Sequence, residues 1–287
     1  MILQTRCFAT GVAIPLALAV LMFAPAGTAR AQTGTIEFTV IVTPASGHPE
    51  PARGQMIFLL RQSFQETRKQ AEAQEPKPDF DKFVDGINQT PELKAWMKKM
   101  RTTTVIGGPF HTMLTADDMV HVPEFLNAYV EANITEAGAD MGFPKPKYRA
   151  GDKTKKPAKY ELDRKQYLDA LRKYYEKNPH SADTIDVYLS DSDHTAEWDR
   201  VMDAWKKRVQ ERATQDAQTR EFSAKVETDL QGRGTFQAPP GTYWLSTLAG
   251  YAVAGDVHLQ WNVPLIVEAG RVTRVELSNV NAERTPR

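Results

Sequence analysis

Both ends of this chain alternate apolar and polar positions, and the long middle does not. Apolar residues recur at every second position over residues 36–42 and 257–263, and Thr273, Val275 and Leu277 alternate with charged residues. A period of two predicts half-buried strands. The run Met56–Leu60 is apolar throughout, and its length favours a strand buried on both faces. We therefore expect β-structure at the two ends of the chain.

Residues 64–222 change to helical periodicity, with apolar residues spaced three and four apart. Two threonines mark expected helix starts. Thr90 precedes a proline at the first helical position, and Thr115 precedes acidic residues that suit the positive end of a helix. The helices are expected over residues 79–87, from Pro91, from Thr115, from Pro123, and over residues 160–177 and 195–222.

The last of these helices has a narrow apolar stripe. Trp198, Met202, Trp205 and Val209 follow one another at spacings of four, three and four. Beyond Val209 the sequence is very polar, so we expect that end to stand clear of the core.

The N-terminal strands are too few to bury a sheet face by themselves. They should therefore pair with the C-terminal strands. This predicts a discontinuous β-sandwich domain of residues 32–63 plus 223–287, with residues 64–222 as a helical insertion, and an α+β fold class.

The C-terminal zone carries a set of short motifs. They are Thr228-Asp-Leu-Gln-Gly232, Gly234-Thr-Phe236, Pro239-Pro-Gly-Thr-Tyr243 and Ala249-Gly-Tyr251, with Gly34-Thr-Ile-Glu-Phe38 and Ala52-Arg-Gly54 near the start. Together, over residues 34–63 and 224–280, they resemble the carboxypeptidase regulatory-like domain. The resemblance implies an Ig/prealbumin-like antiparallel β-sandwich. It also implies an accessory module of exported proteins with a carbohydrate-binding-like fold, without the zinc peptidase chemistry, which belongs to a separate domain.

The first 31 residues have the pattern of a cleavable signal peptide. Arg6 precedes an apolar run, and the stretch ends on Ala29-Arg30-Ala31, a small-x-small cleavage pattern. The only cysteine, Cys7, lies inside this segment. We therefore expect an exported protein, periplasmic or secreted, with no disulfide in its mature part and no transmembrane segment after cleavage.

Charge argues against a nucleic-acid partner. The chain holds 36 basic and 36 acidic residues, and two of the arginines belong to the expected signal peptide. The mature part is then close to −2, which gives no basic field for a phosphate backbone.

Three aromatic residues are candidate ligand-binding residues: Trp244, Tyr251 and Trp261. By strand alternation, Trp244 points away from the sandwich core. Either the helical insertion covers it, which we favour, or it is an exposed platform for a sugar or a partner chain. Alternation places Trp261 toward the core, which weakens its candidacy.

Metal-binding candidates lie in the insertion. Asp191, Asp193 and Glu197 offer oxygens from one stretch, although the pattern fails as an EF-hand and a capped helix start explains it better. A weaker alternative joins His111 and His121 to Asp117 or Asp118.

A basic stretch occupies the middle of the insertion. It contains Lys145, Lys147, Arg149, Lys153, Lys155 and Lys156. It is either a contact for an anionic surface or, as we favour, a solvated linker between helices.

No HExxH, GxSxG, GxxxxGK[ST] or CxxC pattern occurs, and we assign no catalytic residue and no cofactor. The favoured hypothesis is an exported, non-enzymatic binding or assembly module that recognises a protein or glycan of the cell envelope. The alternatives are a carbohydrate-binding module and a metal-dependent hydrolase with its site in the insertion.

Overall fold

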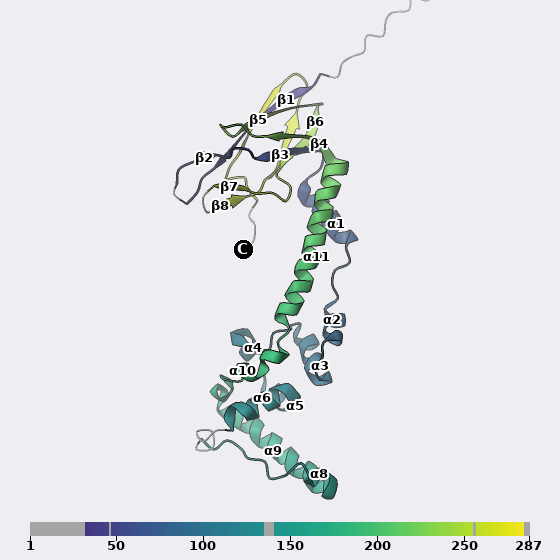
Figure 1. The fold of residues 1–287 in the computed structure, drawn as a ribbon, viewed down its shortest axis with the longest axis vertical. Coiled ribbons are helices and arrows are strands. Elements are labelled where there is room, and N and C mark those ends of the chain that lie inside the picture. The colour runs from purple at the N-terminus through teal and green to yellow at the C-terminus, as the bar shows by residue number, and fades with distance from the viewer. Residues whose placement is uncertain (1–31, 46, 135–140, 255–256, 284–287) are drawn as a thin grey trace, which may run out of the picture.

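The computed structural model describes residues 32–45, 47–134, 141–254 and 257–283. The expected signal peptide lies outside these residues. The molecule is long and narrow (Figure 1). A β domain forms one end, a stalk of two helices leads away from it, and a distal lobe of short helices forms the other end. The fold therefore mixes helices and sheets in the α+β manner.

The β domain contains two main sheets and a small hairpin. In one sheet the order is β10-β1-β2, and β5 also pairs with β1, along the edge opposite β10. The second sheet has the order β4-β3-β6-β9, and β7 pairs with β8. The strands are β1 (Gly34–Val42), β2 (Glu50–Pro51), β3 (Met56–Leu60), β4 (Phe222–Glu227), β5 (Arg233–Ala238), β6 (Gly241–Ser246), β7 (Ala252–Ala254), β8 (Val257–Leu259), β9 (Asn262–Val267) and β10 (Val272–Leu277).

Strands from before and after the helices pair directly, as the scarcity of N-terminal strands led us to expect. β1 pairs with β5 and β10, and β3 pairs with β4 and β6. The pairings are antiparallel as expected, except that β1 and β10 run parallel. A parallel pair needs a long crossover, and here nearly the whole chain separates the two strands.

The two sheets bury one shared hydrophobic core. β1 contributes every second side chain from Ile36 to Val42, and β3 contributes Ile57 and Leu59. The core also explains Gly234, which lies opposite Phe38 in the β1–β5 register. A Cβ at this position would collide with the Phe38 ring, so only glycine fits.

The strand β3 is two-faced, as its unbroken apolar sequence predicted. Ile57 and Leu59 face the β core, while Phe58 and Leu60 belong to a junction cluster on the other side of the sheet. Successive side chains of a strand point to opposite faces, so alternation alone places Leu59 and Leu60 on different sides of the sheet. The junction cluster is Leu60, Phe64, Ala71, Trp205, Val209, Ala213, Ala217 and Leu248, with Phe58, Met202 and Trp244 against it.

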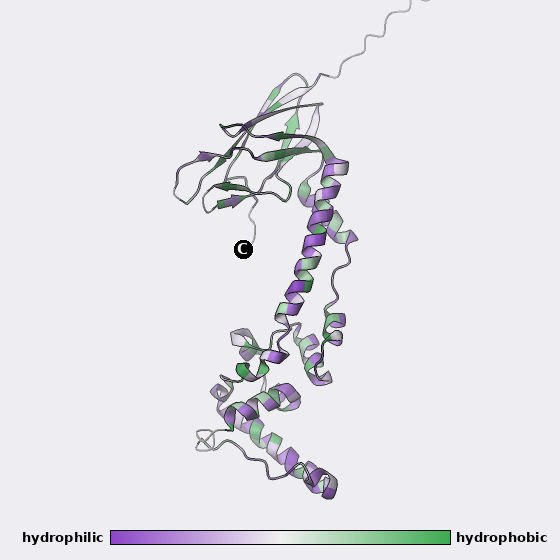
Figure 2. Cartoon of the chain, in the orientation of Figure 1, coloured by the Kyte–Doolittle hydropathy of each residue, from purple (hydrophilic) through white to green (hydrophobic). Residues whose placement is uncertain are grey.

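The stalk consists of α1 (Phe64–Gln74) and α11 (Thr195–Asp216), which pack side by side (Figure 1). The expectation that α11 stands clear of the core beyond Val209 was wrong. Ala213 and Ala217 are both fully buried in the junction cluster. They extend the stripe at a spacing of four, and their small side chains let α11 lie close to α1 and the sheet. The outer side of α11 is mostly hydrophilic (Figure 2).

The distal lobe is built from the remaining helices. They are α2 (Phe80–Gly86), α3 (Pro91–Met100), α4 (Gly107–Met113), α5 (Ala116–His121), α6 (Pro123–Asn133), α8 (Asp152–Lys155), α9 (Pro157–Lys177) and α10 (Asp186–Leu189), with 3₁₀ turns Pro179–Ala182 and Ser190–Ser192. At the other end of the stalk, a π turn, Ala217–Glu221, joins α11 to β4.

The expected helix starts are confirmed. The Thr90 side chain accepts a hydrogen bond from the Leu93 backbone N–H, and Thr115 and Asp118 form a reciprocal capping box. The lobe has its own aromatic core, in which Trp96 packs edge-on against Phe110 and Phe125. Within the residues that the structure describes, no helix combines the length and apolar character needed to cross a bilayer.

Candidate functional site

Trp244 is covered by the stalk. Its side chain is only partly exposed and packs against the junction cluster, together with Phe58 and Met202. Of the two explanations for its outward direction, the structure supports coverage by the helical insertion. Trp244 is therefore a packing residue and no platform for a ligand.

Trp261 lies inside the β core. Its side chain is 1% exposed, and its indole N–H donates a hydrogen bond to the Ser278 carbonyl at 2.9 Å. The ring presents no surface to a ligand, as strand alternation suggested. Its inclusion among the binding candidates is corrected here.

Tyr251 is the one of the three that a ligand can reach, since it is 44% exposed. It lines a groove of about 330 Å³ where the β domain meets the stalk. This junction groove is lined by Phe64, Gln65, Arg68, Lys206, Lys207, Gln210, Ala249, Tyr251, Gln260 and Glu283. Its volume lies at the low end of the range usual for small-ligand pockets.

The loop that carries Tyr251 is held by specific contacts. Leu248 has a φ of 53° and is buried in the junction cluster. A left-handed backbone is costly for a bulky residue and persists only where the surroundings enforce it. Here the Leu248 N–H donates to the Ser246 hydroxyl oxygen, and Thr247 exchanges hydrogen bonds with the Trp261 backbone. The loop is therefore fixed at the edge of the groove.

The groove carries amides and positive charge. The Gln65 amide donates to the Glu283 carboxylate at 2.9 Å, and the Gln260 amide donates to the Leu248 carbonyl at 3.1 Å. Among the described residues nothing donates to their side-chain carbonyl oxygens, which can accept from a ligand. Arg68 has no carboxylate partner among the described residues, so the positive charge of the groove is only partly neutralised.

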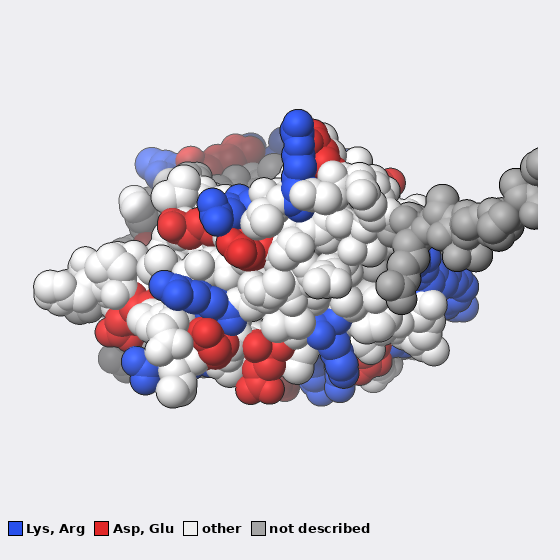
Figure 3. Space-filling model, turned by 90° about the horizontal axis from the view of Figure 1, so that it is seen from above, with Lys and Arg blue, Asp and Glu red and all other residues white. Residues whose placement is uncertain are grey.

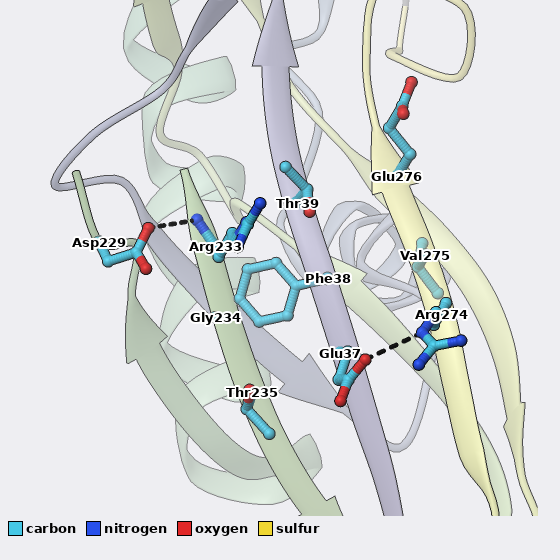
Figure 4. A pocket seen from close by; sticks show the side chains of 10 residues that line it. All are labelled: Glu37, Phe38, Thr39, Asp229, Arg233, Gly234, Thr235, Arg274, Val275 and Glu276. Atoms are coloured by element: carbon cyan, nitrogen blue, oxygen red, sulfur yellow. Dashed lines mark hydrogen bonds and ion pairs between the residues drawn. The ribbon is translucent and has the colours of Figure 1, made fainter. Parts of the chain in front are cut away.

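A second hollow, of about 730 Å³, lies on the β5-β1-β10 sheet (Figure 4). Three of its polar side chains are engaged with one another or with backbone. Glu37 pairs with Arg274 across β1 and β10 at 3.0 Å, and Asp229 accepts from the Arg233 backbone N–H at 2.8 Å. Its aromatic ring, Phe38, is only 2% exposed. Seen from this end, the β domain shows acidic and basic side chains intermixed (Figure 3). We rank this hollow below the junction groove.

The acidic stretch before α11 is a helix start. Asp193 accepts from the backbone N–H groups of Thr195 and Val105, and Glu197 lies 3.5 Å from the His194 ring. Asp191, Asp193 and Glu197 do not converge, because no group of three metal-ligating side chains occurs in the described part of the chain. Asp193 instead holds the backbone at the start of α11, and Glu197 lies in the first turn of that helix.

The histidine alternative fails for the same reason. His111 contacts Asp186 at 2.8 Å, and His121 contacts the backbone carbonyl of Asp117. Asp117 pairs with Arg172, and Asp118 belongs to the capping box. Each of these groups has a local partner, and they form no metal-binding cluster among the described residues.

The basic stretch lies at the far end of the distal lobe, on and around α8 (Figure 1). Lys145, Lys147, Arg149, Lys153, Lys155 and Lys156 are all exposed. α8 lies at the end of the molecule opposite the β domain (Figure 1).

Comparisons with known proteins assign nothing to the chain: no family model, no curated protein and no solved structure matches it. The site has to be judged on its geometry alone.

Sequence reasoning found Tyr251 but missed the rest of the groove. Gln65 and Arg68 lie three apart on α1, and Lys206 and Gln210 lie four apart on α11, so each pair shares a helix face. That spacing was visible in the sequence. What it did not reveal is that the two faces meet the Tyr251 loop.

Proposed function

We propose that the protein is an exported, non-enzymatic binding protein that holds an acidic glycan in the junction groove. The main support is the groove itself, which is lined by glutamine amides and by cations from both stalk helices. Tyr251 borders it on a loop that contains the left-handed Leu248. An aromatic ring offers a face for stacking on a sugar, amides accept and donate to hydroxyls, and Arg68 and the lysines attract a carboxylate.

The prealbumin-like β-sandwich, suggested by the sequence motifs, is part of this proposal. Two sheets around one core and a helical segment entering and leaving at the second sheet support it. On this view the insertion contributes one wall of the groove, which gives the unusual interruption of the domain a binding role.

The test is a glycan array containing neutral and acidic glycans, read with the wild-type protein and with Tyr251→Ala. We expect binding to acidic glycans and a loss of about tenfold in the variant, or roughly 1.4 kcal/mol. Tyr188→Ala is the matched control, because Tyr188 is 51% exposed but lies on the distal lobe.

Two results would contradict the proposal. One is an array without binding. The other is binding that Tyr251→Ala and Tyr188→Ala weaken equally. An acidic peptide array run in parallel separates the two partner classes: Tyr251-dependent binding of peptides alone would make the groove a protein-binding site.

A further inference from the structure

The far end of the distal lobe concentrates positive charge. Residues 141–165 hold nine Lys and Arg against three Asp and Glu, a net charge of +6 on a chain whose formal net charge is 0. Counting the acids at 136 and 140 as well, residues 135–165 still carry +4. The remaining residues together carry the balancing negative charge, so the basic segment stands out from the rest of the chain.

The cations at this basic tip, defined as Lys145, Lys147, Arg149, Lys153, Lys155 and Lys156, lack ion-pair partners among the described residues. Elsewhere exposed cations are commonly paired, as Arg172 is with Asp117 and Arg274 with Glu37. The nearest acid of the tip, Asp152, accepts from the backbone N–H of Arg149. The charge of the tip is therefore left to an external partner.

The basic tip is built on a folded scaffold. Tyr148 packs edge-on between Tyr160 and Tyr167 of α9, with ring centroids 5.0 Å and 5.9 Å away. Burial raises the pKa of Tyr148, and raises that of Tyr167 to about 12, as expected for phenols withdrawn from water. The basic side chains themselves are exposed to solvent, as expected for a linker between helices, but Tyr148 anchors the segment to α9.

The positions of the lysines also oppose the stability of the helix. α9 has no acidic residue in its first turn, and Lys156 and Lys159 lie at its positive end. Cations there are unfavourable, and an anion bound nearby would offset the repulsion. The positions of these lysines therefore favour contact with an external anion over stability of the free helix.

The amino-acid composition of the basic tip favours binding to an extended anionic surface over binding to one defined small ligand. Seven of the nine basic residues in 141–165 are lysines, which act as hydrated point charges without the bidentate geometry of arginine. An apolar side chain accompanies them, since Leu162, near the start of α9, is 56% exposed. Clustered lysines with an exposed apolar neighbour suit a bilayer surface.

We propose that the basic tip docks the protein onto a membrane surface rich in anionic phospholipid headgroups. This inference is independent of the junction groove, which lies at the other end of the stalk. A protein docked at its tip would hold the β domain away from the bilayer.

The experiment is co-sedimentation of the full chain with phosphatidylcholine vesicles, with and without about one third phosphatidylglycerol. We expect binding only to the anionic vesicles, and its loss at ~0.5 M salt, where screening is strong. The triple variant Lys153→Gln, Lys155→Gln, Lys156→Gln should bind tenfold or more weakly, given that each basic residue contributes roughly fivefold near such a surface.

The matched control removes the same charge elsewhere. Lys69, Lys82 and Lys225 are exposed and outside the tip, so their triple change to Gln should leave vesicle binding unchanged. Equal loss in both triple variants, or equal binding to both vesicles, would overturn the proposal. So would tip-dependent binding to soluble alginate without vesicle binding. Tyr251→Ala should not affect co-sedimentation with vesicles, so the glycan-binding proposal and the membrane-docking proposal can be rejected independently.

Discussion

The two hydrophobic cores of this molecule are assembled in opposite ways. The core of the distal lobe comes from one continuous stretch, running from Phe80 to Trp198. The β core combines strands from residues 36–59 with strands from residues 224–277, which are separated by the whole insertion. A continuous core closes short loops, whereas the β core must close a very long one. The distal lobe should therefore be able to fold without the β domain, and the junction cluster is what couples the two.

Removing the largest buried side chain of the β core should separate the two regions most clearly. Trp261→Ala deletes an indole that is 1% exposed and breaks its bond to Ser278, for a cost of about 3–5 kcal/mol. We expect thermal unfolding of the β domain at lower temperature while the distal helices keep their structure. Hydrogen exchange measured by mass spectrometry reports the two regions separately.

The companion variant is Trp96→Ala, because Trp96 is 3% exposed in the distal core. It should weaken exchange protection in the distal lobe and leave the β domain protected. If both variants lower protection everywhere to the same extent, the two cores unfold as one unit and the comparison is wrong.

Raising the pH should destabilise the distal lobe before it destabilises the β domain. Burial raises the pKa of Tyr129 and of Tyr167 to about 12, against 10 for a free phenol. A raised folded-state pKa gives stability that is fully present below pH 10 and is lost as the pH rises from 10 to about 12. The shift corresponds to at most roughly 2–3 kcal/mol per tyrosine. Helical circular dichroism and tyrosinate absorbance, followed together from pH 9 to 12, measure this loss.

Tyr167→Phe provides the control for this titration. Phenylalanine keeps the packed ring and removes the titrating group, so the alkaline loss of helix should become smaller. An unchanged alkaline transition would show that another group drives it.

The sequence anticipated local features far better than contacts between distant segments. The caps at Thr90 and Thr115 and the inward direction of Trp261 follow from short-range patterns, so they were predictable. The burial of Ala213 and the junction groove depend on α1, α11 and the Tyr251 loop meeting in space. Alanine carries a weak hydrophobic signal, and parallel pairing of β1 with β10 leaves no mark in either strand.

The alanines of α11 give the smallest and most specific test, because they decide how closely the stalk approaches the sheet. Ala213 is fully buried, so Ala213→Leu forces extra volume between α11 and α1 and should cost about 1–3 kcal/mol in a denaturant titration. Ala204→Leu adds the same side chain at an exposed position of the same helix and should stay within about 0.5 kcal/mol of wild type. If overpacking loosens the junction, exchange protection should fall in α1 and at Leu248 while the distal core around Trp96 keeps its protection. Equal effects from the two leucines would mean that the polar half of α11 stands free after all, and that the two cores are linked by the chain without packing.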